Sequence, residues 1–251
     1  LIDILADSTG VANEYKVIEN SAQTFADNIN EFSGMIGERQ VGCPLVVHRR
    51  CIEPMFSISN MISYDNRMFN KTHKKEDYLK QEQPFLIKKS GWINVEGTEN
   101  GSKDHFVKNQ AERVCQLLEN ALHIYTNLYE TDDKIFIITP FRTVAESMRK
   151  FVIGYFSVKG YDKEMLTKWT KNCVGTVHTF QGKDANEVLF VLGCSDKSVG
   201  AMNWVVKKAN ILNVACTRAK YRIAFIGNLN DWKNRRYFRE FIPKFIDTID
   251  A

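Results

Sequence analysis

The sequence predicts an α/β fold in which helices cover both faces of a mostly parallel sheet. Short, continuous apolar runs recur along the chain, and segments with helical spacing of apolar residues lie between them. Strands buried on both faces read as such runs, because helices cover each face of a parallel sheet. The chain has 251 residues and contains neither internal repeats nor linkers rich in proline or serine, so residues 1–251 are interpreted as a single domain.

Six apolar runs are interpreted as buried strands: Pro44–Val47, Trp92–Val95, Ile135–Ile138, Val174–Val177, Val188–Leu192 and Ile223–Ile226. Amphipathic helices are expected at Lys108–Tyr129 and Thr143–Phe156, where apolar residues recur at helical intervals. Residues 1–43 are expected to be irregular. Residues 68–83, rich in Lys, His, Asp and Asn, are expected to form a solvated surface loop.

Charge, cysteine spacing and the length of apolar runs limit the classes of partner and site that the chain could have. A net charge of +4 and a pI of about 8.6 are compatible with a polyanionic partner without demonstrating one. The 6 cysteines form no CxxC pair and no zinc-finger spacing with histidine, which favours reduced core thiols and no metal site. No apolar run is long enough for a membrane span and no signal peptide is recognisable, so we expect a cytoplasmic protein without a membrane partner. The chain opens in mid-pattern without a methionine, which favours a fragment of a longer protein.

The first candidate site follows the run Ile135–Ile138. In parallel sheets ligands bind at the carboxyl ends of strands. The residues at this end are Thr139, Pro140, Phe141 and Arg142. The proline ends the strand and a helix is expected from Thr143. A hydroxyl, an aromatic ring and a guanidinium beside a helix N-terminus suit a phosphate or a stacked base, although a plain strand-to-helix turn is the alternative.

The second candidate is the loop GTVHTFQGKDANE at residues 175–187. Its donors for a sugar-phosphate backbone are Thr176, His178 and Thr179. Gly182 permits close approach of the backbone. Lys183 and Asp184 follow it, and a lysine can meet phosphate while a carboxylate accepts from ribose hydroxyls. A lone histidine is more often structural than functional.

The third candidate is the segment NILNVACTRAK at residues 210–220, which is expected to be helical. Arg218 and Lys220 lie near its C-terminal end, where the helix dipole favours cations, and this is the plain interpretation. The sharper interpretation is that Arg218 points into a cleft and stabilises charge on a transferring γ-phosphate.

In this order the segments resemble the C-terminal motifs of Upf1-like superfamily 1 helicases. Residues 175–193 (GTVHTFQGKDANEVLFVLG) resemble motif V, and residues 210–228 (NILNVACTRAKYRIAFIGN) resemble motif VI. IFIITPFR resembles motif IVa. LVVHRRC resembles motif IV, with Arg50 at the position of the motif's arginine. Ile52 and Glu53 replace the usual His-Pro of motif IV, and Asp184 is shorter than the usual Glu of motif V.

The resemblance implies a RecA-like P-loop NTPase fold, acting as a second motor domain packed on an upstream RecA-like domain. That upstream domain would bind most of ATP and Mg²⁺. Arg218 would act as arginine finger, which can contribute about 10³–10⁵-fold, with Arg50 as a second γ-phosphate contact. The nucleotide side would be lined by Gln181, Gly182, Lys183 and Asp184.

The resemblance also implies a grip on single-stranded DNA or RNA. The residues implied are Thr139, Pro140, Phe141, Arg142, Thr176, His178 and Thr179. No GxxxxGK[ST] loop is present in the chain, so we expect the fragment alone not to hydrolyse ATP. Three alternatives stay open: a catalytically silent nucleic-acid-binding or regulatory module, a different α/β nucleotide enzyme, and a plain structural α/β domain.

Overall fold

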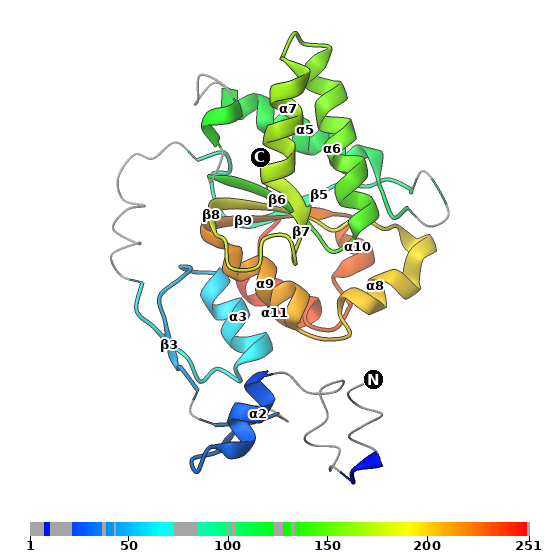
Figure 1. Cartoon of the computed structure of the whole chain (residues 1–251). Helices are drawn as coiled ribbons and strands as arrows, with labels where there is room; N and C mark the ends of the chain where they lie inside the picture. Colours follow the sequence, from blue (N-terminus) through cyan, green and yellow to red (C-terminus); the bar gives the residue numbers. More distant parts are fainter. Residues whose placement is uncertain are drawn as a thin grey trace.

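The centre of the molecule is a five-stranded parallel sheet with the order β5-β9-β8-β6-β7 (Figure 1). The strands are β5 (Gly91–Asn94), β6 (Ile135–Thr139), β7 (Val174–Thr176), β8 (Ala185–Val191) and β9 (Ala219–Gly227). The structure is a computed structural model and describes residues 8–10, 22–36, 39–42, 44–72, 85–99, 101, 104–122, 128–131 and 134–249. The prediction of a parallel α/β sheet is confirmed.

Helices cover both faces of this sheet, as predicted (Figure 1). One face carries α5 (Lys108–Leu122), α6 (Arg142–Ser157) and α7 (Lys163–Cys173). The other carries α3 (Met55–Ser63), α9 (Asn210–Arg218) and α11 (Phe238–Phe245). The short helices α8 (Val199–Val205) and α10 (Leu229–Trp232) follow β8 and β9, and 3₁₀ turns occupy Leu128–Thr131 and Asp196–Ser198.

Burial explains why the apolar runs became strands. All five residues of β6 are buried, and six of the seven residues of β8 are buried. Trp92 of β5 stacks on Phe225 of β9 with ring centroids 5.8 Å apart. Burying one such side chain contributes about 1.5–3 kcal/mol, so the continuous runs fix the sheet.

The predicted helices occur with shifted ends. Helix α5 buries its predicted stripe at Ala111, Val114, Cys115 and Leu118. It ends at Leu122 rather than Tyr129, and residues 123–127 lie outside the described residues. Helix α6 extends the predicted Thr143–Phe156 by one residue at each end.

Two expectations about the N-terminal part were wrong. Pro44–Val47 is not a strand of the central sheet. Instead β3 (Val47–His48) pairs with β4 (Phe69–Asn70), which lies in the predicted loop 68–83, and Leu45 is 91% exposed because no core covers it. The described part of residues 1–43 is not irregular, since it contains α2 (Ala22–Ile29) and an antiparallel hairpin of β1 (Gly34–Ile36) and β2 (Arg39–Val41). Residues 73–83 lie outside the described residues.

The described thiols lie in the core, as the composition favoured. The five described cysteines, Cys51, Cys115, Cys173, Cys194 and Cys216, are all buried, and Cys43 lies outside the described residues. Among the described helices, none has the length and apolar character that crossing a membrane requires.

Strand β8 buries a carboxylate. The two oxygens of Glu187 accept hydrogen bonds from the backbone N–H groups of Leu86 (2.6 Å) and Ile87 (2.8 Å), and Glu187 is 1% exposed. Burial raises the pKa of Glu187 to about 7, although both backbone donors and the nearby Arg222 oppose the shift. Glu187 therefore fastens the segment before β5 to the middle of the sheet.

Candidate functional site

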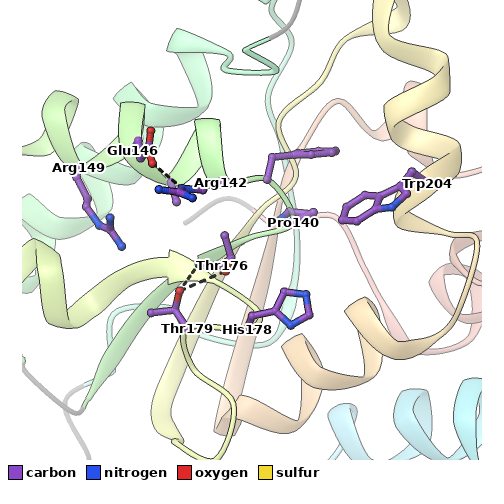
Figure 2. Close-up of a pocket in the computed structure, with 10 residues that line it drawn as sticks. Pro140, Arg142, Glu146, Arg149, Thr176, His178, Thr179 and Trp204 are labelled. Carbon is purple, nitrogen blue, oxygen red and sulfur yellow. Dashed lines mark hydrogen bonds and ion pairs between the residues drawn. The ribbon is translucent and has the colours of Figure 1, made fainter. Parts of the chain in front are cut away.

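A pocket of about 550 Å³ lies where β6 and β7 end (Figure 2). We call it the strand-end pocket. Its lining comes from the β6–α6 turn, α6, the loop after β7, and α8: Pro140, Phe141, Arg142, Ala145, Glu146, Arg149, Thr176, His178, Thr179 and Trp204. Six of the seven residues predicted to grip a nucleic acid thus come together, although they lie on segments far apart in the sequence.

The first wall is the start of α6. Pro140 ends β6, and Phe141, the N-cap residue of α6, supplies no side-chain cap hydrogen bond to the first amides of the helix. Such a helix N-terminus favours an anion. The Arg142 side chain is 88% exposed and its Nε lies 2.9 Å from Glu146 Oε1. An ion pair this exposed is weak, so a phosphate can replace the carboxylate.

The second wall is the loop after β7. A Cβ on Gly175 would lie 2.8 Å from Thr179 Cβ, so the absence of a side chain lets the loop fold back on its strand. Thr179 Oγ1 accepts from Thr176 N at 3.2 Å and lies 3.2 Å from Thr176 Oγ1 (Figure 2). The two hydroxyls therefore form a pair on the pocket wall, with exposed His178 beside them.

Thr139 departs from the prediction. It is 2% exposed and does not line the strand-end pocket. Its hydroxyl accepts from Phe141 N at 3.4 Å, because strand β6 turns its last side chain inward and the hydroxyl then caps the turn. Thr139 therefore shapes the turn, and its side chain is not among those that line the pocket.

Four lining residues were missed by the sequence interpretation: Ala145, Glu146, Arg149 and Trp204. Arg149 donates from Nε (2.9 Å) and Nη2 (2.7 Å) to the carbonyl of Val174, which ties α6 to β7. Helical spacing places Arg142, Glu146 and Arg149 on one face of α6, and this signal was available in the sequence. Trp204 carried no comparable signal, because tertiary packing of α8 brings it to the pocket.

The predicted arginine finger is buried at the opposite edge of the sheet. Arg218 is 5% exposed; its Nη1 donates to the carbonyls of Phe180 (3.2 Å) and Lys183 (2.9 Å), and Nη2 donates to Thr217 Oγ1 at 3.3 Å. Its Nε is buried and has no hydrogen-bond partner among the described residues. A guanidinium has five N–H hydrogens, so the Nε hydrogen and part of those on Nη2 remain unused among the described residues, and Nε itself is closed to solvent.

The structure brings Arg50 into the same region. Ile52 N donates to the Lys220 carbonyl at 3.1 Å, which fastens the segment of Arg50 beside the end of α9. Cys51 N donates to His48 Nε2 at 2.9 Å and fixes the intervening turn. Burial lowers the pKa of Arg218 and the positive charge of Arg50 lowers it further, whereas the charge of Asp184 opposes the shift. Two guanidinium groups therefore lie close enough to repel each other.

The residues predicted for the nucleotide side form the tip of the loop. Gln181, Gly182 and Lys183 are exposed, and Gly182 has φ +88° with nothing within 4 Å of an added Cβ. Asp184 Oδ1 lies 2.8 Å from Lys220 Nζ, so this carboxylate already has a cation. The tip is open to solvent, and the carbonyls of Phe180, just before it, and of Lys183 accept hydrogen bonds from Arg218.

The loop of residues 177–184 joins the two regions. It begins at the strand-end pocket and ends at β8, where Ala185 pairs with Ala219 directly after Arg218. Arg218 therefore lies at the amino ends of β8 and β9, whereas the sequence interpretation looked for ligands at carboxyl ends. Phe180 anchors the middle of the loop, because it is fully buried and stacks on Phe136 at 4.2 Å.

A third polar cluster lies behind the pocket. Potential ligand atoms of Glu99, His105 and Cys194 lie within 4.8 Å of one another. The Glu99 carboxylate accepts from Ser195 N (2.8 Å) and Ser198 Oγ (2.9 Å), and burial, followed by the charge of Glu99, raises the pKa of the Cys194 thiol. These hydrogen bonds account for the carboxylate, so we assign the cluster the role of holding the start of α8.

Residues 31–230 match the protein family described as an AAA domain, of the type found in Upf1-like helicases. The match covers most of the chain, and the chain belongs to this family. Together with the five-stranded parallel sheet, it establishes an α/β RecA-like fold.

A relative agrees with this family. An uncharacterized ATP-dependent helicase of Methanocaldococcus jannaschii is 26% identical over 214 residues, which cover 79% of this chain and 28% of the relative. The chain therefore spans little more than a quarter of the length of that relative. The family and this likeness support a function of the helicase type.

Proposed function

We propose that this chain is the second motor domain of an ATP-dependent superfamily 1 nucleic-acid helicase or translocase. The observation that carries the proposal is a buried cation with no carboxylate of the described residues within ion-pair distance; the charge of Asp184, which is paired with Lys220, acts on it only from farther away. Among the described residues no carboxylate forms an ion pair with Arg218, and Arg50 adds a second positive charge nearby. A buried charge needs a counter-charge. Two neighbouring guanidinium groups have the charge and the planar donors that fit the γ-phosphate of a nucleotide.

In this proposal Arg218 is the arginine finger and Arg50 a second γ-phosphate contact. ATP and Mg²⁺ are held mainly by an upstream RecA-like domain and supply the phosphoryl group that is transferred. The carbonyls of Phe180 and Lys183 orient the Arg218 guanidinium. Its fixed direction stabilises charge without reorganisation at the moment of reaction. The chain alone is then inactive, because the finger has no nucleotide to act on.

The strand-end pocket is the proposed grip on single-stranded DNA or RNA. The amides at the start of α6, the guanidinium of Arg142 and the Thr176–Thr179 hydroxyl pair suit a sugar-phosphate backbone. A grip on the backbone gives weak base preference and strong salt dependence. Gln181, Gly182, Lys183 and Asp184 line the nucleotide side, so the loop of residues 177–184 couples nucleotide state to the grip.

The test uses the longer native protein that contains this chain. ATP hydrolysis is measured with and without single-stranded DNA and RNA, for the wild type, Arg218→Ala and the matched control Arg239→Ala, an exposed arginine of α11. We expect strand-stimulated hydrolysis that falls by about 10³-fold or more in Arg218→Ala and is unchanged in the control. A folded wild type without turnover under any condition would instead indicate a silent nucleic-acid-binding or regulatory module.

A further inference from the structure

Trp204 lines two pockets at once. It lies at the end of the strand-end pocket opposite Arg149 (Figure 2), and it also lines a second hollow of about 560 Å³ with Gly200, Asn203, Val206, Lys207 and Arg236. We infer that a single strand of nucleic acid continues from the strand-end pocket across Trp204 into this second hollow. One base stacks on the indole, and the following phosphates lie beside Lys207 and Arg236. This inference rests on the proposed function, because it extends the same track.

The indole is presented to solvent as a surface for stacking. Trp204 is 49% exposed, whereas the other three tryptophans, Trp92, Trp169 and Trp232, are at most 2% exposed. Its helix packs through Met202 and Val205, which are fully buried, so the fold does not need the indole in its core. The Trp204 ring lies 5.8 Å from that of Phe141, tilted by 35°, so the buried Phe141 ring supports the exposed indole. Bases stack on such surfaces without regard to sequence.

Helix α8 is held at both ends, which fixes the indole before a ligand arrives. At its start, Ser198 Oγ donates to Glu99 Oε2 at 2.9 Å and lies 3.1 Å from His105 Nδ1. Near its end, Arg235 Nη1 donates to Asn203 Oδ1 at 2.7 Å. A surface that is already ordered loses little entropy on binding, so the stack adds to affinity.

The charge of the second hollow selects a polyanion. Lys207 and Arg236 are exposed there, Arg236 lies over the Tyr237 ring at 4.8 Å, and the residues that line the hollow include no carboxylate. An apolar or basic peptide would leave these cations without partners. Cations beside an exposed aromatic surface are the combination that binds single-stranded nucleic acids.

The first experiment measures affinity with the longer native protein and fluorescein-labelled dT₁₂ and U₁₂, by fluorescence anisotropy over a series of salt concentrations. Trp204→Ala is expected to weaken binding roughly tenfold or more. Met165→Ala, which removes a side chain of similar exposure (44%) from α7, is expected to leave binding unchanged. Wild type and Trp204→Ala are expected to bind an abasic dodecamer with equal affinity, because it has no base to stack on the indole.

The cations are tested by their salt dependence. Replacing both Lys207 and Arg236 with alanine is expected to lower the slope of log affinity against log salt by about 1.4. The control, with Lys168 and Lys171 of α7 replaced, removes the same charge from a helix that lines neither pocket, and it is expected to keep the slope.

A second readout reports the stack itself. Binding of unlabelled dT₁₂ is expected to quench tryptophan fluorescence in the wild type, and this quench is expected to disappear in Trp204→Phe, which keeps most of the affinity. Unchanged affinity in Trp204→Ala together with an unchanged quench in Trp204→Phe would overturn the inference. If Arg142→Ala still weakened binding in that case, the proposed grip would stand alone. A wild type that binds neither oligonucleotide would overturn both.

Discussion

The two ends of the central sheet present arginine in opposite ways. At the strand-end pocket the Arg142 side chain is 88% exposed and forms an exchangeable ion pair with Glu146. At the amino ends of β8 and β9, Arg218 is 5% exposed and its guanidinium is held by two backbone carbonyls. An exposed arginine can bind one phosphate after another as a strand moves past it. A buried and oriented arginine suits a single charge that develops at one place. Under the proposed function, the exposed arginine belongs to the surface along which the strand moves, and the buried arginine belongs to the site of phosphoryl transfer.

The largest effect is expected at the buried end. In the longer native protein, Arg218→Lys keeps the charge but loses the planar fork that reaches both carbonyls, so we expect it to resemble Arg218→Ala, with turnover about 10³-fold below wild type. Affinity for dT₁₂ is expected to stay within about threefold, because Arg218 lies outside the strand-end pocket. Parallel measurements of turnover and anisotropy check this. A lysine variant with near-normal turnover would show that charge alone suffices.

Phe180 tests the connection between the two ends. Its ring is fully buried against Phe136, and its carbonyl accepts from Arg218. Phe180→Ala is expected to lower the free energy of unfolding by about 3–4 kcal/mol in urea titrations. Phe180→Leu, which fills more of the space, is expected to lose less than half of that. In the double variant, the turnover losses from Phe180→Ala and Arg218→Ala are expected to be strongly non-additive. Simple additivity would mean that the loop does not act through Arg218.

Glu187 lies on β8, between the two ends of the sheet, and makes the stability of the sheet depend on pH. Its pKa is raised to about 7, so between about pH 4.5 and 7 the folded protein holds a proton that the unfolded chain releases. The free energy of unfolding is therefore expected to fall as pH rises through this window, by about 3 kcal/mol in total. Chemical denaturation at pH 5 and pH 7.5 measures it, and Glu187→Gln is expected to remove the difference. An equal pH dependence in the variant would assign it to other groups.

The smallest effect is expected at the exposed end. Arg142→Ala in the longer native protein is expected to weaken dT₁₂ binding about threefold to tenfold and to lower the salt slope by about 0.7, because one phosphate contact is lost. Glu146→Gln removes the competing carboxylate and is expected to strengthen binding slightly. Anisotropy at several salt concentrations measures both. An unchanged slope in Arg142→Ala would mean that its guanidinium contacts no phosphate.

The sequence predicted what depends on local pattern. Ile135–Ile138 and Val188–Leu192 were recognised as strands because both faces of each are buried. Arg142 was recognised because it follows a strand, and the segment of Thr176 because it resembles motif V. The run Pro44–Val47 has the same local pattern, but none of the described helices or strands buries Leu45, so burial had to be read from the structure. Strand order and the return of α8 to the pocket also depend on tertiary packing. For that reason Trp204 was missed, and the inward orientation of Thr139 was not foreseen.

The place of β7 at the edge of the described sheet determines how the loop of residues 177–184 can move. This strand is bonded to β6 through three residue pairs only, while β8 is paired on both sides. A displacement of the loop therefore strains a short ladder at the margin and leaves β6, β8 and β9 in register. The edge strand is expected to open locally more easily than the central strands. Amide hydrogen exchange is therefore expected to be faster in Val174–Thr176 than in the middle of β8.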